Sequence, residues 1–261
     1  MSHVKLYVLN NEAESERQQT PESGQAVRLA CPVTLQQFSG GSLSFQEGLV
    51  AVESDIRIVV NGRDFGALTR TPGDDLSLIA GYLFTHSMIR EGDDMVDCSF
   101  RYRSTSHATV TLKTAECIRR LYPSPKPVHV VPERVFAFKR SFERRQNLYK
   151  NTRSTHGAAL FSLEGELLAF GEDVGRHNAF DKAIGRALLE GTLDRVNIAM
   201  LSSRLALELT KKAATANIPI LCGFSAATSS SINYAERNNI TLVGRIRSDS
   251  FDVYSNGWRF Q

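Results

Sequence analysis

The chain has 261 residues, of which 42% are hydrophobic and 23% are charged, as in a globular protein of one large or two modest domains. Its formal net charge of +3 lies too near zero to indicate a nucleic-acid-binding protein. The longest apolar runs are too short to span a bilayer, and the N-terminus lacks the apolar core of a signal peptide. The four cysteines include no Cys-x-x-Cys pair, which argues against a disulfide scaffold or a zinc ribbon. We therefore expect a cytoplasmic protein with no structural metal, no nucleic-acid partner and no membrane contact.

The first half of the chain is predicted to be rich in β-strands. Residues 1–25 are polar, and we expect them to be disordered or frayed. Residues 26–132 are expected to form a smaller β-rich domain. Within it, the Asn61-Gly62 pair lies between alternating polar and apolar residues, which predicts a hairpin turn. The pattern over 71–89 predicts a helix.

The second half, residues 133–261, is predicted to be an α/β domain that binds a cofactor. It opens with a basic helix over 133–148 and a hairpin that turns at Glu164-Gly165. Helices and strands then alternate, with helices expected over 176–191, 203–217 and 228–239 and strands over 196–201, 218–224 and 240–246. Such alternation with short connections predicts three layers around a mainly parallel sheet.

Polar residues follow three successive strands of this domain. Ligands of open α/β sheets bind beyond the carboxyl ends of the strands, where helices begin. Hydroxyl groups, free main-chain N–H groups and arginines at such points suit an anionic group, although serine and aspartate are also ordinary helix caps. The candidate cofactor-binding residues at these three points and along the helix that begins at the first of them are Arg176, His177, Asn178, Asp181, Lys182, Ser202, Arg204, Ser225 and Thr228.

The helix over 176–191 carries two pairs of polar residues at a spacing of four. His177 can contact Asp181, and Asn178 can contact Lys182. An aspartate that orients a histidine is compatible with catalysis, and it is equally compatible with a structural network. Gly185 in the middle of this helix predicts the close approach of another main chain or of a ligand.

A zinc deaminase is disfavoured on chemical grounds, although it could have the same fold. Its signature needs a glutamate two residues after a histidine and a Cys-x-x-Cys pair. His156 is followed by Gly157 and Ala158, and the cysteine pair is missing.

Residues 172–185 read "EDVGRHNAFDKAIG", and this stretch closely resembles the signature of the formate dehydrogenase accessory proteins, the FdhD/NarQ family. The stretches "VNGRDFGALTRTPGDDLSLIAGYLF", "THGAAL" and "IPILCGFSAATSSSINYAERNNITLVGRIR" are also similar to that family. The resemblance covers most of the chain from about residue 50.

The resemblance implies a cytoplasmic homodimer whose larger domain has a cytidine-deaminase-like fold without the deaminase zinc site. It implies an accessory sulfurtransferase that takes sulfur from a cysteine desulfurase. The acceptor would be the bis-molybdopterin guanine dinucleotide form of the molybdenum cofactor, before this cofactor enters formate dehydrogenase.

The resemblance also implies roles for particular residues. Cys117 stands where the family has the first cysteine of its sulfur relay, and Arg120 stands where the second cysteine would be. Cys117 is therefore the expected catalytic residue, acting as a persulfide. The stretch where the family contacts its cofactor adds six candidates, namely Arg245, Ile246, Arg247, Ser248, Asp249 and Ser250.

Two alternatives stay open beside the sulfurtransferase. Because the second cysteine is missing, the protein could hold the molybdenum cofactor or help its insertion without transferring sulfur. The basic stretch from Lys139 to Lys150 could instead dock an acidic partner.

Overall fold

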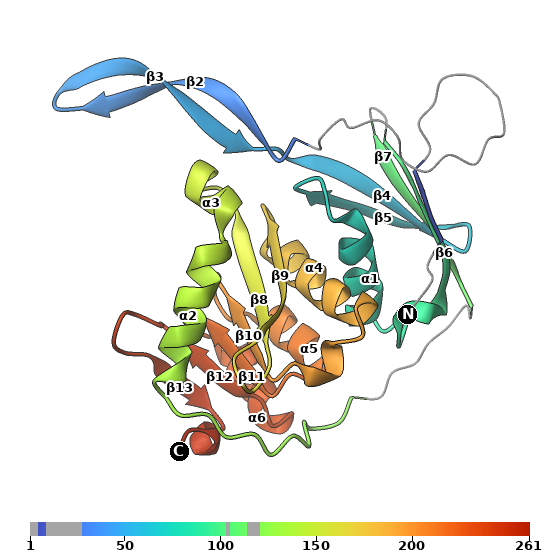
Figure 1. Cartoon of the computed structure of the whole chain (residues 1–261), viewed down its shortest axis with the longest axis vertical. Coiled ribbons are helices and arrows are strands. Elements are labelled where there is room, and N and C mark those ends of the chain that lie inside the picture. Colours follow the sequence, from blue (N-terminus) through green and yellow to red (C-terminus); the bar gives the residue numbers. More distant parts are fainter. Residues whose placement is uncertain (1–4, 9–27, 103–104, 114–120) are drawn as a thin grey trace.

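The computed structural model describes residues 5–8, 28–102, 105–113 and 121–261. They form a five-stranded sheet, a six-stranded sheet and a two-stranded hairpin that projects from the body (Figure 1). None of the helices in these ranges is long and apolar enough to cross a membrane.

The five-stranded sheet comes from the first half of the chain and has the order β1-β6-β7-β4-β5. Its strands are β1 (Lys5–Val8), β4 (Ser54–Val60), β5 (Arg63–Arg70), β6 (Met95–Arg101) and β7 (Ser106–Leu112). The predicted hairpin is confirmed, because β4 and β5 pair antiparallel around Asn61 and Gly62, with φ values of 48° and 77°. The short 3-10 helix η1 (Gly92–Asp94) leads into β6.

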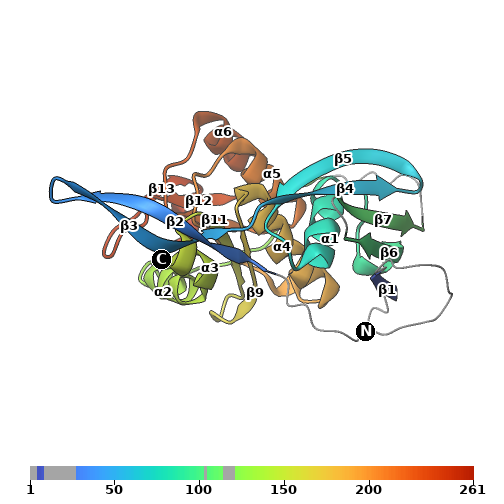
Figure 2. The same cartoon turned by 90° about the horizontal axis from the view of Figure 1, so that it is seen from above.

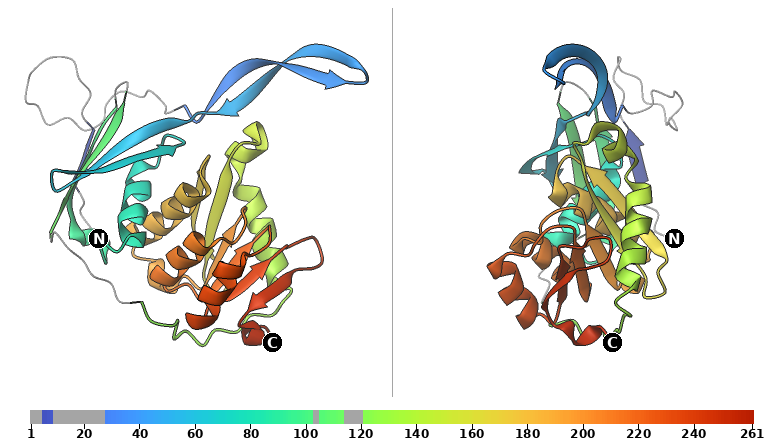
Figure 3. Two further views of the ribbon diagram at one scale, coloured as in Figure 1. Left: turned by 180° about the vertical axis from the view of Figure 1, so that it is seen from behind. Right: turned by 90° about the vertical axis from the view of Figure 1, so that its left-hand side faces the viewer.

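The projecting hairpin consists of β2 (Ala30–Ser39) and β3 (Ser42–Ala51), which pair along their full length. The chain reverses at Gly40 and Gly41, both of which have positive φ. Figure 3 shows this hairpin reaching beyond the rest of the molecule. Large apolar side chains at its far end are exposed, including Phe38 and Phe45.

The six-stranded sheet comes from the second half and has the order β13-β12-β11-β10-β8-β9. Its strands are β8 (His156–Phe161), β9 (Leu167–Asp173), β10 (Ile198–Leu201), β11 (Ile220–Gly223), β12 (Thr241–Gly244) and β13 (Asp252–Ser255). The prediction of a mainly parallel sheet is wrong. Only β10, β11 and β12 run parallel to one another, whereas the β8–β9 hairpin and the returning strand β13 pair antiparallel.

Helices cover both faces of this sheet (Figures 1 and 3). On one face lie α2 (Arg134–Arg145) and the short α3 (Asn147–Thr152), which divide the predicted basic helix at Gln146. The opposite face is covered by α4 (Arg176–Leu189), α5 (Leu207–Thr215) and α6 (Ser229–Arg237). The remaining short helices are η2 (Leu193–Arg195) and η3 (Gly257–Arg259). The predicted α/β layering of this half is therefore confirmed.

The two sheets are joined through α1 (Asp75–Thr85), which lies between the five-stranded sheet and α4 (Figure 2). The helices cross at two glycines. A Cβ atom on Gly185 would lie 1.9 Å from the carbonyl oxygen of Ser77, and one on Gly81 would lie 1.9 Å from the carbonyl oxygen of Asp181. The predicted close approach at Gly185 is thus to another main chain. One continuous apolar cluster contains buried residues from both sheets. The division into domains at residue 132 stays a prediction.

We expect Gly185→Ala to destabilise the protein by about 3 kcal/mol or more, because the added methyl group meets main-chain atoms that cannot move aside. Urea denaturation of the full chain measures this. The control is Ala137→Gly on an exposed position of α2, which costs about 1 kcal/mol through helix propensity alone. A Gly185→Ala variant as stable as the parent would contradict the close crossing.

Candidate functional site

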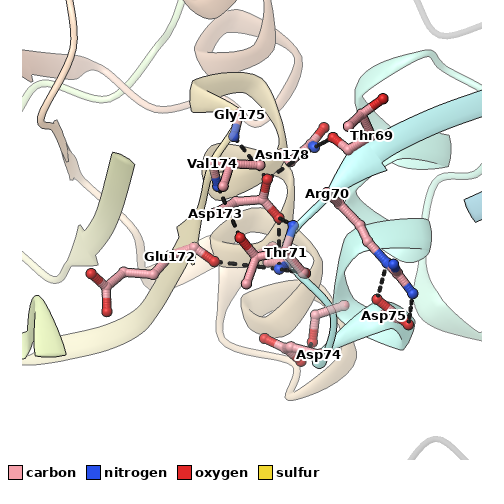
Figure 4. A network of polar contacts seen from close by, with 12 residues as sticks. Thr69, Arg70, Thr71, Asp74, Asp75, Glu172, Asp173, Val174, Gly175 and Asn178 are labelled. Carbon is pink, nitrogen blue, oxygen red and sulfur yellow. Dashed lines mark hydrogen bonds and ion pairs between the residues drawn. The ribbon is translucent and has the colours of Figure 1, made fainter. Parts of the chain in front are cut away.

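Asp173, at the end of β9, is the centre of a buried polar network (Figure 4). One carboxylate oxygen accepts a hydrogen bond from the N–H of Thr71 at 3.1 Å and pairs with the ammonium group of Lys182 at 2.7 Å. The other accepts hydrogen bonds from the N–H of Gly175 at 2.8 Å and from the side-chain amide of Asn178 at 3.1 Å. A buried charge is tolerated when it is paired and hydrogen-bonded in this way.

The same network ties the signature stretch to the end of β5. Lys182 donates to the carbonyl oxygen of Thr71 at 2.8 Å, and Asn178 donates to that of Thr69 at 2.7 Å. The hydroxyl of Thr71 accepts a hydrogen bond from the N–H of Val174 at 3.1 Å. Asn178 and Lys182 therefore both bond to Asp173 and to β5, and these contacts give them a structural part.

Glu172 faces away from this network, toward α3 (Figure 4). Its carboxylate accepts hydrogen bonds from the N–H groups of Leu148 at 3.1 Å and Tyr149 at 3.0 Å. These are N–H groups of the first helical turn, which have no partner within the helix, and a carboxylate there is also favoured by the helix dipole. Glu172 thereby fixes the start of α3 beside the sheet.

The predicted pair of His177 and Asp181 does not share a hydrogen bond in the described structure. Asp181 is buried and instead contacts the ammonium group of Lys212 at 2.6 Å and the hydroxyl of Thr85 at 2.9 Å. Burial lowers the pKa of His177, and the positive charges of Arg176 and Lys212 lower it further. This geometry favours the structural interpretation of the two that the sequence left open.

A cavity of about 460 Å³ lies at the end of the six-stranded sheet where β10 ends and β8 begins. Its walls include Tyr149, His156, Ser202 and Phe224. The hydroxyl of Ser202 lies 3.1 Å from Nδ1 of His156 and accepts a hydrogen bond from the N–H of Gly157 at 3.1 Å. Burial lowers the pKa of His156, and so does the nearby charge of Arg176.

His156 lines this cavity but was not among the ligand-binding residues predicted from the sequence. The sequence indicated it only as a histidine that lacks the rest of the deaminase signature. The antiparallel pairing that puts the start of β8 opposite the end of β10 brings it to Ser202.

The loops after β10 and β11 lie side by side at this edge. Leu205 forms a parallel bridge with Ala227, and the N–H of Thr228 donates to the carbonyl oxygen of Leu205 at 3.1 Å. Arg204 is exposed, and Ser225 and Thr228 are partly exposed. The structure thus brings together the second and third groups of predicted residues.

The stretch from Arg245 to Ser250 follows β12 and adjoins the same edge. The N–H of Arg245 donates to the carbonyl oxygen of Ser225 at 3.1 Å, and its guanidinium group pairs with Asp252 at 3.3 Å. The side chain of Ile246 is buried in the apolar core, and its predicted contact with a cofactor stays a prediction. The N–H of Arg247 donates to the carbonyl oxygen of Ser250 at 2.8 Å, which closes a tight turn.

That turn exposes Ser248, Asp249 and Ser250. The two serine hydroxyls each lie 3.4 Å from the carboxylate of Asp249. Their predicted contact with a cofactor stays a prediction.

The cysteines differ in their access to solvent. Cys117, the expected catalytic residue, lies outside the described residues. Cys98 and Cys222 are buried, and burial raises the pKa of both thiols to about 12. Cys31 on the projecting hairpin is partly exposed. The described part of the chain holds no group of three or more histidine, cysteine or acidic side chains arranged to bind a metal ion.

These features define a mixed α/β protein with a cavity at one end of its six-stranded sheet. Basic and hydroxyl side chains lie at the same end, and such groups are suited to binding an anionic ligand. Comparison with known proteins then gives the family. Residues 51–261 match the model of the FdhD/NarQ family, and the chain belongs to this family.

Its relatives include proteins named "Sulfur carrier protein FdhD". The protein from Streptomyces avermitilis is 32% identical over 82% of this chain and 90% of its own length. The one from Saccharolobus solfataricus is 33% identical over 80% of this chain and 90% of its own length. A crystal structure from Desulfotalea psychrophila, described provisionally as a formate dehydrogenase accessory protein, shares the fold. It has a TM-score of 0.76 at 24% identity, over 89% of this chain and all of that one.

We expect Lys182→Met to lower the free energy of unfolding by about 3–5 kcal/mol, because it leaves Asp173 buried and unpaired. Urea denaturation measures this. The matched control is Arg195→Met, which removes the exposed ion pair with Glu166 and is expected to leave the midpoint unchanged. Equal losses in the free energy of unfolding would show that the buried pair stabilises the protein no more than the exposed pair.

A second expectation concerns pH. Because the pKa values of His156 and His177 are lowered by burial, protons bind to the unfolded chain first as the pH falls below about 6.5. The contribution of these histidines to stability is therefore complete above that pH and is lost below it. We expect the His156→Gln/His177→Gln variant to lose less stability than the parent between pH 7.5 and 5.5. Urea midpoints at the two pH values provide the comparison, and equal losses would contradict the shifted pKa values.

Proposed function

We propose that the protein is a sulfur carrier that acts for a formate dehydrogenase. It takes sulfur from a cysteine desulfurase as a persulfide on Cys117. Its acceptor is the bis-molybdopterin guanine dinucleotide form of the molybdenum cofactor, which is bound as a substrate. Membership of the FdhD/NarQ family and the names of the curated relatives support this proposal. We further propose that it works as a homodimer in the cytoplasm.

The substrate assignment rests on a difference among the predicted site residues: some have their polar atoms bonded to other protein groups, and others do not. Asn178, Asp181 and Lys182 have their polar atoms bonded to protein groups, so we propose that they position the site and do not contact the ligand. Arg176 and Arg204 keep guanidinium groups for which the described structure shows no ion pair. Arginine is suited to bidentate contact with phosphate.

The cavity at His156, which Arg153 also lines, suits one nucleotide end of the cofactor. Its volume of about 460 Å³ is within the range of small-molecule sites. Tyr149 and Phe224 supply aromatic surfaces on which a guanine can stack, and Ser202 and His156 supply polar groups. The exposed arginines Arg245 and Arg247 extend the basic character along the same edge.

The sulfur-accepting step needs one accessible thiolate. In it, the Cys117 thiolate attacks the outer sulfur of the desulfurase persulfide, a new S–S bond forms, and the donor cysteine leaves as a thiolate. The buried thiols of Cys98 and Cys222 have raised pKa values, near 12, because of burial, so they are poor candidates for this step.

A second function is kept because Arg120 stands where the family has another cysteine. In this alternative the protein holds the molybdenum cofactor, or assists its insertion, without carrying sulfur.

Sulfur transfer is tested by incubating the full chain with a cysteine desulfurase and cysteine, followed by intact-mass analysis and peptide mapping. We expect a gain of one sulfur on Cys117 that is lost in Cys117→Ser and retained in the control Cys31→Ser. Absence of added sulfur on the parent protein would leave the cofactor-holding alternative as the better account.

Ligand binding is tested by calorimetry with GDP as a fragment of the cofactor. We expect Arg176→Ala to weaken GDP binding about tenfold or more, because a charge-assisted contact to phosphate is lost. Arg195→Ala, at a distant exposed arginine, is the control and is expected to bind normally. Unchanged affinity in Arg176→Ala would remove this residue from the site.

A further inference from the structure

The projecting hairpin of β2 and β3 carries exposed apolar side chains on one of its faces. Residues that pair directly across two strands point to the same face, and so do residues two positions apart on one strand. Phe38 pairs with Leu43, and Phe45 lies two positions beyond Leu43. These three side chains are 70%, 65% and 74% exposed, respectively. They therefore share one face near the tip of the hairpin, and we call them the hairpin patch.

The opposite face of the hairpin is polar at the same distance from the body, where it carries Gln37, Ser44 and Gln46. A ribbon with one apolar and one polar face normally packs its apolar face against another element. The exposure of the hairpin patch shows that no described part of this chain covers it. An isolated two-stranded hairpin is also only marginally stable in water. Both features indicate that another molecule covers the patch.

The composition of the hairpin favours a permanent partner. Glu47 is the only charged residue among residues 30–51, and its carboxylate accepts a hydrogen bond from the hydroxyl of Thr34 at 2.7 Å. Permanent interfaces are apolar and poor in charged residues, whereas partners that bind and separate use more polar surfaces. The partner that is always present beside this chain is a second copy of it. A two-fold axis would bring the hairpin patch against itself.

The exposed area of the patch is of the size that such a pair of copies needs. A buried aromatic side chain removes about 200 Å² from solvent, so Phe38 and Phe45 alone account for roughly 600 Å² in two copies at their observed exposures. This is about half of the roughly 1,200 Å² at which stable interfaces begin. Leu43, together with Leu49 and Pro32 on the same face, adds further apolar area.

The base of the hairpin supports one wall of the cavity at His156. The N–H of Ala51 donates to the hydroxyl of Ser154 at 3.3 Å, and α3 packs against β3. Ser154 and Tyr149 of α3 both line that cavity. Because a lone hairpin is only marginally stable, a partner that stabilises it also stabilises these contacts at its base.

We propose that the hairpin patch binds the same patch of a second copy of the chain, and that this pairing holds the α3 wall of the cavity at His156 in place. The inference rests on the proposed function in one respect, since it names the surface that forms the proposed homodimer. It does not involve Cys117, so it is independent of sulfur transfer.

Sedimentation velocity of the full chain over a range of concentrations tests the pairing. We expect the parent to sediment as a dimer and the Phe38→Ser/Phe45→Ser variant to dissociate at least 100-fold more readily, because the apolar contact is lost. The control is Val96→Ser, which removes an apolar side chain that is 51% exposed on β6 and should dissociate within twofold of the parent. The urea midpoint should rise with protein concentration for the parent and not for the double variant.

Two further measurements locate the contact and its effect on the cavity. A photoreactive benzoylphenylalanine in place of Phe45, in a mixture of unlabelled and ¹⁵N-labelled chains, should cross-link residues 30–51 of one copy to the same residues of another. Hydrogen exchange read by mass spectrometry should be faster in residues 149–156 of the Phe38→Ser/Phe45→Ser variant than in the parent, because the base of the hairpin no longer holds them.

A parent chain that sediments as a monomer would overturn both this inference and the proposed homodimer. A dimer that persists in the double variant, or a cross-link to a peptide outside residues 30–51, would reject the hairpin as the contact and leave the homodimer standing. Equal exchange in residues 149–156 would overturn the link to the cavity. None of these results bears on whether Cys117 accepts sulfur, which the intact-mass measurement decides separately.

Discussion

The arrangement of the molecule depends on the contact between α1 and α4, where Gly81 and Gly185 let the two main chains touch. Larger side chains at these positions would hold the helices apart. The end of β5 would then lie too far from β9 for Thr71 to reach Asp173. Thr71 also completes the hydrogen bonds of the buried pair of Asp173 and Lys182, which helps to offset the cost of burying two charges. The close helix approach that two glycines allow is therefore required for the buried ion pair of the signature stretch.

The signature stretch divides its polar residues between two tasks. Asp173, Asn178 and Lys182 join the two halves of the chain, and Glu172 fixes the start of α3. The side chains so fixed are unable to rearrange freely, which is what a site needs if it is to hold a ligand in one orientation. Arg176, at the first position of α4, keeps its charge available at the sheet edge. Conformational rigidity and ligand contact thus come from neighbouring residues of one short segment.

Local patterns in the sequence correctly predicted the features that depend only on neighbouring residues in the chain. The Asn61-Gly62 turn, the helix α1 and the close approach at Gly185 all follow from backbone preferences of a few residues. The direction of β8 and the existence of β13 depend on how distant strands pair, and the predicted mainly parallel sheet was wrong for that reason. Asn178 and Lys182 also bond to Thr69 and Thr71, which lie more than 100 residues earlier, so helical spacing alone could not reveal these contacts.

That long separation has a consequence for how the chain is made. Thr71 leaves the ribosome 111 residues ahead of Lys182, its hydrogen-bond partner. At typical synthesis rates this is a delay of roughly 5 to 20 s. During that interval α1 has no α4 to cover it, and the five-stranded sheet presents the apolar surface of this helix to the surroundings. Slow translation through residues 72–182 would therefore lengthen the time for which this apolar surface is exposed.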